Sequence, residues 1–293
     1  MKRRVAGAPI SWGVCEVPGW GYQMDAERVL REAAELGMTA VEAGPEGFLP
    51  PGPDEASRLL SEHGLSLVGG FVPAVLHRPE VRESELDSVE RQAGLFSDAG
   101  AGVLVIAASS GREGYEGSAE LGDGAWEELF ATLAVVEEIG GKYGLSVVLH
   151  PHYGTAIERP EHVRRFLDGC EMGLCLDTGH SMVGGGDPVE LVEIAADRIR
   201  HVHLKDVDQG LAERVVSGDL GYEEAVRRGL YRPLGGGDVD VLRVLELLEA
   251  AGYEGWYVLE QDIMLDAEPE PGAGPIESVR GSLTFLSRVF QSV

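Results

Sequence analysis

Residues 141–149, GKYGLSVVL, place one glycine between a helical pattern and a short apolar run typical of a buried strand. The same arrangement recurs at residues 34–42 (AELGMTAVE), 61–69 (SEHGLSLVG) and 249–259 (EAAGYEGWYVL). Glycine suits the end of a helix because it adopts the left-handed backbone conformation at low cost. A repeated unit of helix, glycine and apolar strand predicts a parallel sheet covered by helices.

Eight such units follow one another along the chain. The expected strands are 4–10, 39–44, 65–71, 102–108, 145–150, 172–177, 198–206 and 255–260. The expected helices are 25–37, 54–64, 83–98, 125–144, 160–168, 187–196, 238–252 and 275–290. The pattern predicts an α/β fold, a single (β/α)8 TIM barrel domain over residues 1–293, and barrels of about 250 residues are common. A doubly wound sheet is the rival, but no GxGxxG follows an early strand. The segments 207–237 and 266–274 are expected to be rim loops, with Asp238 capping the next helix.

Composition limits the partners. The chain has 24 Lys and Arg against 50 Asp and Glu, a formal net charge of −26, which repels nucleic acid and anionic membranes. No apolar stretch approaches the length of a membrane span. The three cysteines, which lack CxxC spacing and fit a reducing compartment, are Cys15, Cys170 and Cys175. We therefore expect a cytoplasmic protein whose partner is a small molecule and neither nucleic acid nor a membrane, with a homo-oligomer as one expected state of assembly.

Four expected strands end on side chains that bind metals. VVLHPH ends with His150 and His152, LCLDTGH with Asp177 and His180, HVHLKD with His203 and Asp206, and YVLEQD with Glu260 and Asp262. If the strands are parallel in one barrel, their carboxyl ends meet at one rim. A mixed set of imidazoles and carboxylates suits a divalent transition metal better than calcium or a thiolate-bound zinc. The sequence therefore predicts a metalloenzyme.

Several motifs resemble those of the xylose-isomerase-like TIM-barrel superfamily, in its inosose dehydratase and sugar isomerase/epimerase branch. They are SWG (11–13), VEAGPEGFLP (41–50), HPHYGT (150–155), LDTGH (176–180), HVHLKD (201–206), LGGGDVD (234–240) and LEQD (259–262). The resemblance implies one divalent ion (manganese, cobalt, magnesium or zinc) held by Asp177, His203, Glu260 and the group that ends strand five. The isomerases mostly have a glutamate followed by asparagine there, whereas this chain has His150, which argues against epimerisation by two glutamates.

Roles follow for the neighbouring side chains. We expect His150 to be the strand-five ligand, although Pro151 leaves the register open and His152 is the alternative. His152 or Lys205 is the candidate base, and His180 or the remaining histidine the candidate acid. Trp12, Trp20 and Glu42 are assigned to substrate binding. Their structural alternatives are packing for the tryptophans and a buried salt bridge for Glu42, and a helix N-cap is the alternative for Asp177.

The expected activity is metal-dependent dehydration of a cyclic polyol ketone such as scyllo-inosose, a step of inositol catabolism, through an enediolate. A ketose or inosose isomerase or epimerase using the same site is the closest alternative. An endonuclease-IV-like DNA-repair enzyme would need more metal ligands than AASS (107–110) and HLKDVDQ (203–209) provide. A non-catalytic polyol-binding barrel is the fourth interpretation.

Overall fold

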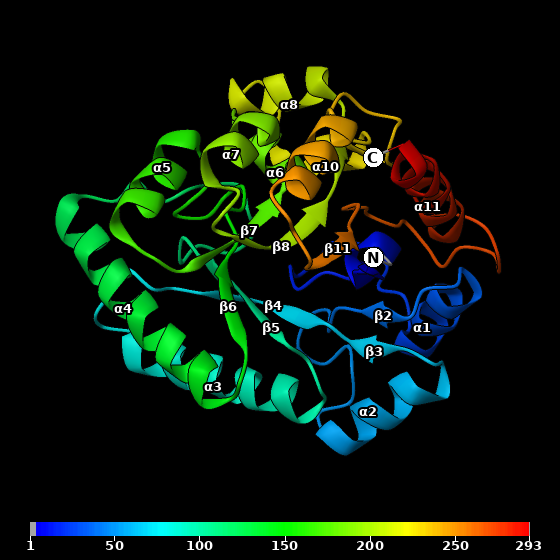
Figure 1. Ribbon diagram of the computed structural model, residues 1–293, viewed down its shortest axis with the longest axis horizontal. Coiled ribbons are helices and arrows are strands. Elements are labelled where there is room, and N and C mark those ends of the chain that lie inside the picture. Colours follow the sequence, from blue (N-terminus) through cyan, green and yellow to red (C-terminus); the bar gives the residue numbers. More distant parts are fainter. Residues whose placement is uncertain (1–3, 293) are drawn as a thin grey trace.

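Parallel strands close into a ring in the computed structural model, which describes residues 4–292 (Figure 1). The barrel strands are β1 (Arg4–Gly7), β2 (Ala40–Val41), β3 (Ser66–Leu67), β4 (Gly69–Ala74), β5 (Val103–Ala108), β6 (Ser146–Leu149), β7 (Gly173–Asp177), β8 (Ile199–Leu204) and β11 (Trp256–Leu259). Their order around the sheet is β3-β2-β1-β11-β8-β7-β6-β5-β4. The TIM-barrel prediction is confirmed; residues 1–3 and 293, which the single-domain prediction also included, lie outside the described residues.

The third strand of the barrel joins the two ends of this order. Its first part, β3, pairs with β2, and its second part, β4, pairs with β5. Between them, Val68 donates its N–H to the carbonyl of Val41, and its own carbonyl accepts from Gly102. One continuous segment therefore joins the two ends of the strand order and closes the ring.

Helices surround the ring on the outside (Figure 1). They are α1 (Ala26–Glu35), α2 (Pro53–Glu62), α3 (Arg82–Asp98), α4 (Asp123–Lys142), α5 (Pro160–Gly169), α6 (Thr178–Val183), α7 (Pro188–Ala195), α10 (Val241–Ala250) and α11 (Pro275–Ser292). The glycines that follow α1, α2, α4 and α10 have positive φ values of 80°, 69°, 69° and 78°: Gly37, Gly64, Gly144 and Gly252. The repeated glycine therefore ends these helices as the sequence pattern indicates.

Three local predictions need correction: the end of the first strand, the cap of α10 and the loop at 207–237. The first strand stops at Gly7, and Pro9–Trp12 forms the 3-10 helix η1, because proline has no N–H to extend the strand pairing. The cap of α10 is Asp240, whose carboxylate accepts from Arg243 N–H, whereas Asp238 accepts from Gln209 in the preceding segment.

The expected rim loop at 207–237 is instead largely ordered. It contains β9 (Asp206–Val207), α8 (Gln209–Val216), α9 (Tyr222–Arg227) and β10 (Tyr231–Arg232), and β9 and β10 pair as an antiparallel ribbon. This excursion lies beside the carboxyl end of β8 and brings two tyrosines to the site described below. No helix in the described part of the chain is long and apolar enough to cross a membrane.

Candidate active site

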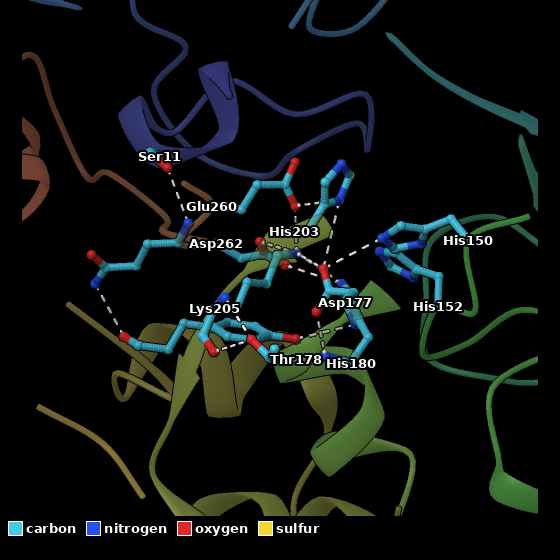
Figure 2. Close-up of polar contacts among 12 residues, drawn as sticks. Ser11, His150, His152, Asp177, Thr178, His180, His203, Lys205, Glu260 and Asp262 are labelled. Carbon is cyan, nitrogen blue, oxygen red and sulfur yellow. Dashed lines mark hydrogen bonds and ion pairs between the residues drawn. The ribbon is translucent and has the colours of Figure 1, made fainter. Parts of the chain in front are cut away.

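The four predicted metal ligands meet at the carboxyl end of the barrel. His150 follows β6, Asp177 ends β7, His203 lies in β8, and Glu260 follows β11. One ligand atom from each residue lies within 4.8 Å of the others. Figure 2 shows His150 and His152 on one side of Asp177, and Glu260 and His203 on the other side. The four side chains therefore lie together at one rim of the barrel, and their assignment as metal ligands stays a prediction.

The two carboxylate oxygens of Asp177 contact different groups. Its Oδ1 atom accepts the N–H of His180 at 2.7 Å and so caps α6. Its Oδ2 atom faces the barrel centre, 3.3 Å from Nε2 of His150 and 3.7 Å from Nδ1 of His203. The helix cap and the ligand position, which the sequence presents as alternatives, coexist on the two oxygens of one carboxylate.

His203 is oriented by a carboxylate behind it. Its Nε2 atom lies 3.2 Å from Oε1 of Glu42, and we assign the ring proton to this nitrogen. The opposite atom, Nδ1, is buried without a hydrogen-bond partner among the described residues, yet lies 3.2 Å from Oε2 of Glu260. A ring nitrogen that presents its lone pair beside two carboxylates is the arrangement that a divalent cation requires, and carboxylates commonly orient such ligands from behind. The residues present therefore fit a metal ion.

Two other groupings fit an ion less well. Oε1 of Glu42 also lies 2.7 Å from Nε2 of His201, so the hydrogen bonds of Glu42 to His201 and His203 already satisfy that cluster. Cys175 lies near His150 and His203, but burial raises the pKa of its thiol to about 11, which keeps it protonated. The assignment of Glu42 to substrate stays a prediction; its observed contacts are those of a residue that positions His203.

Lys205 lies among three carboxylates. Its Nζ atom is 2.7 Å from Oδ1 of Asp262, 3.0 Å from Oε2 of Glu260 and 3.5 Å from Oδ2 of Asp177. Burial alone would lower the pKa of Lys205, but the surrounding negative charges outweigh burial and hold the pKa well above its usual range. The environment therefore favours an ammonium, a proton donor, over the base that the sequence also allowed.

Hydrogen bonds around Lys205 form a closed ring. From Nζ the ring runs to His180 Nε2 (2.9 Å), from His180 Nδ1 to the Tyr231 hydroxyl (3.3 Å), to the Tyr222 hydroxyl (3.0 Å), to Asp262 Oδ2 (3.1 Å), and back to Nζ. His180 is 1% exposed and is not among the residues that line the pocket. The structure thus places His180 beneath the pocket, in contact with Lys205.

His152 also lines the pocket, beside His150. Its Nδ1 atom lies 2.7 Å from the carbonyl oxygen of Tyr153, so we assign the proton there and leave Nε2 as an acceptor. Burial lowers the pKa of His152 well below its usual range, and the ring is neutral. Its ring packs between those of His180 and Tyr115, with centroids 3.7 and 4.2 Å away. The contact with Tyr153 thus holds the ring in one tautomer and leaves the lone pair on Nε2.

The pocket above these groups has a volume of about 500 Å³. Trp20 lines it, as the sequence predicts for a substrate wall, and its indole N–H donates to the carbonyl of Ile263. Trp12 does not line it: the side chain is fully buried, and its N–H donates to Glu32 in α1. The structure therefore places Trp12 in the packing between η1 and α1, outside the pocket.

Asp206, a candidate ligand in the HVHLKD motif, points away from the cluster. Its Oδ2 atom accepts N–H groups of Gly235 and Gly237 at 2.8 and 3.0 Å, and Oδ1 accepts from Val239 at 3.0 Å. A Cβ on Gly237 would lie 2.4 Å from Asp206 Oδ1. The glycine turn of LGGGDVD therefore wraps a carboxylate of this chain.

Sequence reasoning missed several pocket residues. Asp262 was named only as a possible metal ligand at the end of its strand and received no role beside Lys205, although burial raises the pKa of its carboxyl to about 6. Phe71 and Tyr115 also line the pocket, next to His150 and His152. The spacing of Asp262, two residues after Glu260, was a usable signal; the aromatic residues had none.

Comparison with known proteins agrees with this architecture. The xylose isomerase-like TIM barrel family matches residues 30–284. An inosose dehydratase from Geobacillus kaustophilus is 31% identical over 98% of this chain and 94% of its own length. The rhizopine catabolism protein MocC of Rhizobium meliloti is 33% identical over 89% of this chain and 82% of its own. A solved L-ribulose 3-epimerase has a similar fold, with a TM-score of 0.72 at 16% identity, covering 99% of this chain and 95% of the other.

Proposed function

Because the chain belongs to the xylose isomerase-like TIM barrel family, we propose that it is a divalent-metal-dependent lyase that removes water from a cyclic polyol ketone. Its similarity to inosose dehydratases over nearly the whole chain makes it an enzyme of the lyase or isomerase type. The observation that carries the proposal is a cluster of four potential ligands, three of which line the pocket together with Lys205 and His152. Scyllo-inosose is the substrate that we propose.

His150, Asp177, His203 and Glu260 would hold one ion of manganese, cobalt, magnesium or zinc. Such an ion supplies Lewis acidity, which stabilises negative charge that develops on the oxygen of a ketone. All three potential ligand groups among the described residues share His203, so they offer a place for one ion at a time. A DNA-repair enzyme that relies on a cluster of several metals is therefore not favoured.

Two side chains, His152 and Lys205, would carry out the two proton transfers. Nε2 of His152 would remove the proton from the carbon next to the ketone, and the electron pair of that C–H bond forms the enediolate. Lys205 would then donate a proton from Nζ as the C–O bond at the next carbon breaks, so that the hydroxyl leaves as water. His180 and Asp262 hold Nζ from two sides and thereby fix the direction of this donation.

Trp20, Phe71 and Tyr115 give the pocket aromatic walls. Aromatic faces suit the C–H faces of a polyol ring, while the ring hydroxyls require polar partners at the metal end of the pocket. This division favours a small cyclic substrate over nucleic acid, in line with the −26 charge.

The direct experiment is an assay of scyllo-inosose with protein that has been stripped of metal and then supplied with manganese, cobalt, magnesium or zinc in turn. Water loss that depends on the added metal is the expected result. A His203→Gln protein, which lacks a ligand, is the negative control. No elimination with any of the four metals would rule out the dehydratase proposal, and release of an epimer would favour the isomerase alternative.

A further inference from the structure

The pocket continues beyond the cation-binding residues into a mostly apolar extension. Its walls come from the β2–α2 loop, α2, β3 and α3, and we call it the lateral groove, defined by Leu49, Ala56, Leu67, Gln92, Leu95 and Phe96. None of these residues takes part in the chemistry proposed above. The same cavity contains His150, His203 and Glu260, so the groove and the catalytic centre are continuous.

The sheet topology explains why there is space here. The third strand pairs with β2 only through β3. The next contact between the two segments is a hydrogen bond in which the N–H of Ala43 donates to the carbonyl of Gly69. Beyond it, β4 pairs with β5. The walls of the cavity at this point include Ala43 and Gly44 on one side and Phe71 to Pro73 on the other. The cavity therefore passes sideways between the ends of β2 and β4 toward α2 and α3.

One face of α3 forms the length of the groove. Ser88, Gln92, Leu95 and Ala99 all line the cavity, and their spacing of three or four residues places them in a row. Ala99 lies eleven positions after Ser88, which corresponds to about 16 Å along the helix. A cavity of about 500 Å³ lies within the range of roughly 300–1,000 Å³ that holds drug-sized ligands, which are larger than one polyol ring.

The opposite wall is stiff. The loop after β2 contains Pro50, Pro51 and Pro53, all of which line the cavity and have a fixed φ angle. This loop includes the end of the VEAGPEGFLP motif, to which the proposed reaction gives no role. A wall that is rigid before binding loses little entropy when a ligand enters.

We propose that the lateral groove binds an apolar alkyl or aryl group attached through one ring oxygen of the cyclic polyol ketone. This inference rests on the proposed function, because it assumes that the ring itself binds at the cation end. The polar groups of the cavity gather there, whereas the groove offers mainly carbon atoms. The substrate class is therefore an ether or glycoside of the polyol ketone with an apolar substituent.

The test compares scyllo-inosose with its O-benzyl ether, using the metal-loaded enzyme. Burying an aromatic group of this size predicts a kcat/KM roughly tenfold to a hundredfold higher for the ether. A Gln92→Trp substitution would fill the groove and lower the ratio of the two kcat/KM values by at least about tenfold. An Asp87→Trp substitution, at an exposed position of the same helix outside the cavity, is the matched control and should leave the ratio unchanged.

Equal kcat/KM values for the two compounds, or a ratio that Gln92→Trp does not change, would overturn the inference while leaving the dehydratase proposal intact. If neither compound is converted, the dehydratase proposal fails. The binding of both compounds, measured by calorimetry, then tests the groove separately. Tighter binding of the ether, lost in Gln92→Trp, supports the groove; equal binding of both compounds excludes it.

Discussion

Oε1 of Glu42 lies 3.2 Å from Nε2 of His203, and through this contact the second strand of the barrel orients a ligand on the seventh. The opposite nitrogen of His203 is left facing Glu260 and Asp177. Because the bond to Glu42 holds one nitrogen of the ring, it orients the other, Nδ1, toward Glu260 and Asp177.

Replacing Glu42 with glutamine should therefore weaken metal binding. The amide can still contact the ring, but it carries no charge to hold the proton on Nε2. We expect the affinity for manganese or cobalt to fall about 10- to 100-fold, measured by titration of metal-free protein. Glu46→Gln, at an exposed position of the loop that follows, is the control; an unchanged affinity in Glu42→Gln would show that the contact is merely structural.

Exchange of His150 and His152 for asparagine should separate binding from turnover. His150→Asn is expected to lose the metal, because it removes a ligand. His152→Asn keeps a donor for the carbonyl of Tyr153 but removes the base, so it should retain one equivalent of metal while kcat falls by about 10²- to 10⁴-fold. Elemental analysis and kinetics of both proteins check this, and the reverse pattern would make His152 the ligand.

Lys205→Met should abolish turnover more than binding. The substitution removes the ammonium from beside three carboxylates and leaves no proton donor for the departing hydroxyl. We expect kcat to fall by about 10²- to 10⁴-fold while the metal content stays near one equivalent. A protein that retains most of its kcat would refute the role of Lys205 as an acid.

Asp177 allows its two functions to be measured apart. Asp177→Asn and Asp177→Ala should both lose the metal, since each removes the charged ligand. Only alanine also removes the acceptor for the N–H of His180. We therefore expect the free energy of unfolding of metal-free Asp177→Ala to be about 1 kcal/mol lower than that of metal-free Asp177→Asn. Chemical denaturation of the two proteins gives this difference, and equal stabilities would mean that the cap contributes nothing.

The glycine of the LDTGH motif should be required for close packing. A Cβ on Gly179 would lie 2.6 Å from the Cβ of Lys205, so Gly179→Ala must push α6 and β8 apart. We expect a loss of about 1–3 kcal/mol in unfolding free energy and a lower kcat. Gly141→Ala, in α4 where a Cβ would meet open space, is the control and should be neutral or stabilising.

Much of the barrel was predictable because its signals are local. Apolar strands, helical spacing and glycine caps each lie within a few residues, and in a parallel barrel the strand ends must meet at one rim. The convergence of Asp177, His203 and Glu260 followed from that rule alone.

The remaining features depend on contacts between distant segments. Asp206 follows the same strand as His203, yet its carboxylate turns to the backbone of Gly235 and Gly237. The positions of Tyr222 and Tyr231 depend on an ordered excursion that has no barrel periodicity. The burial of Trp12 and the hydrogen bond between Glu42 and His203 could not be predicted from residue spacing, because each depends on how two elements face one another.

The central claim is elimination of water at this single site, and one measurement tests it most directly. Metal-loaded protein is incubated with scyllo-inosose in deuterated water, and the products are followed by NMR. Our account predicts a product that has lost one hydroxyl group together with the neighbouring ring proton. Deuterium incorporation with every hydroxyl retained would contradict it, as would an unchanged substrate.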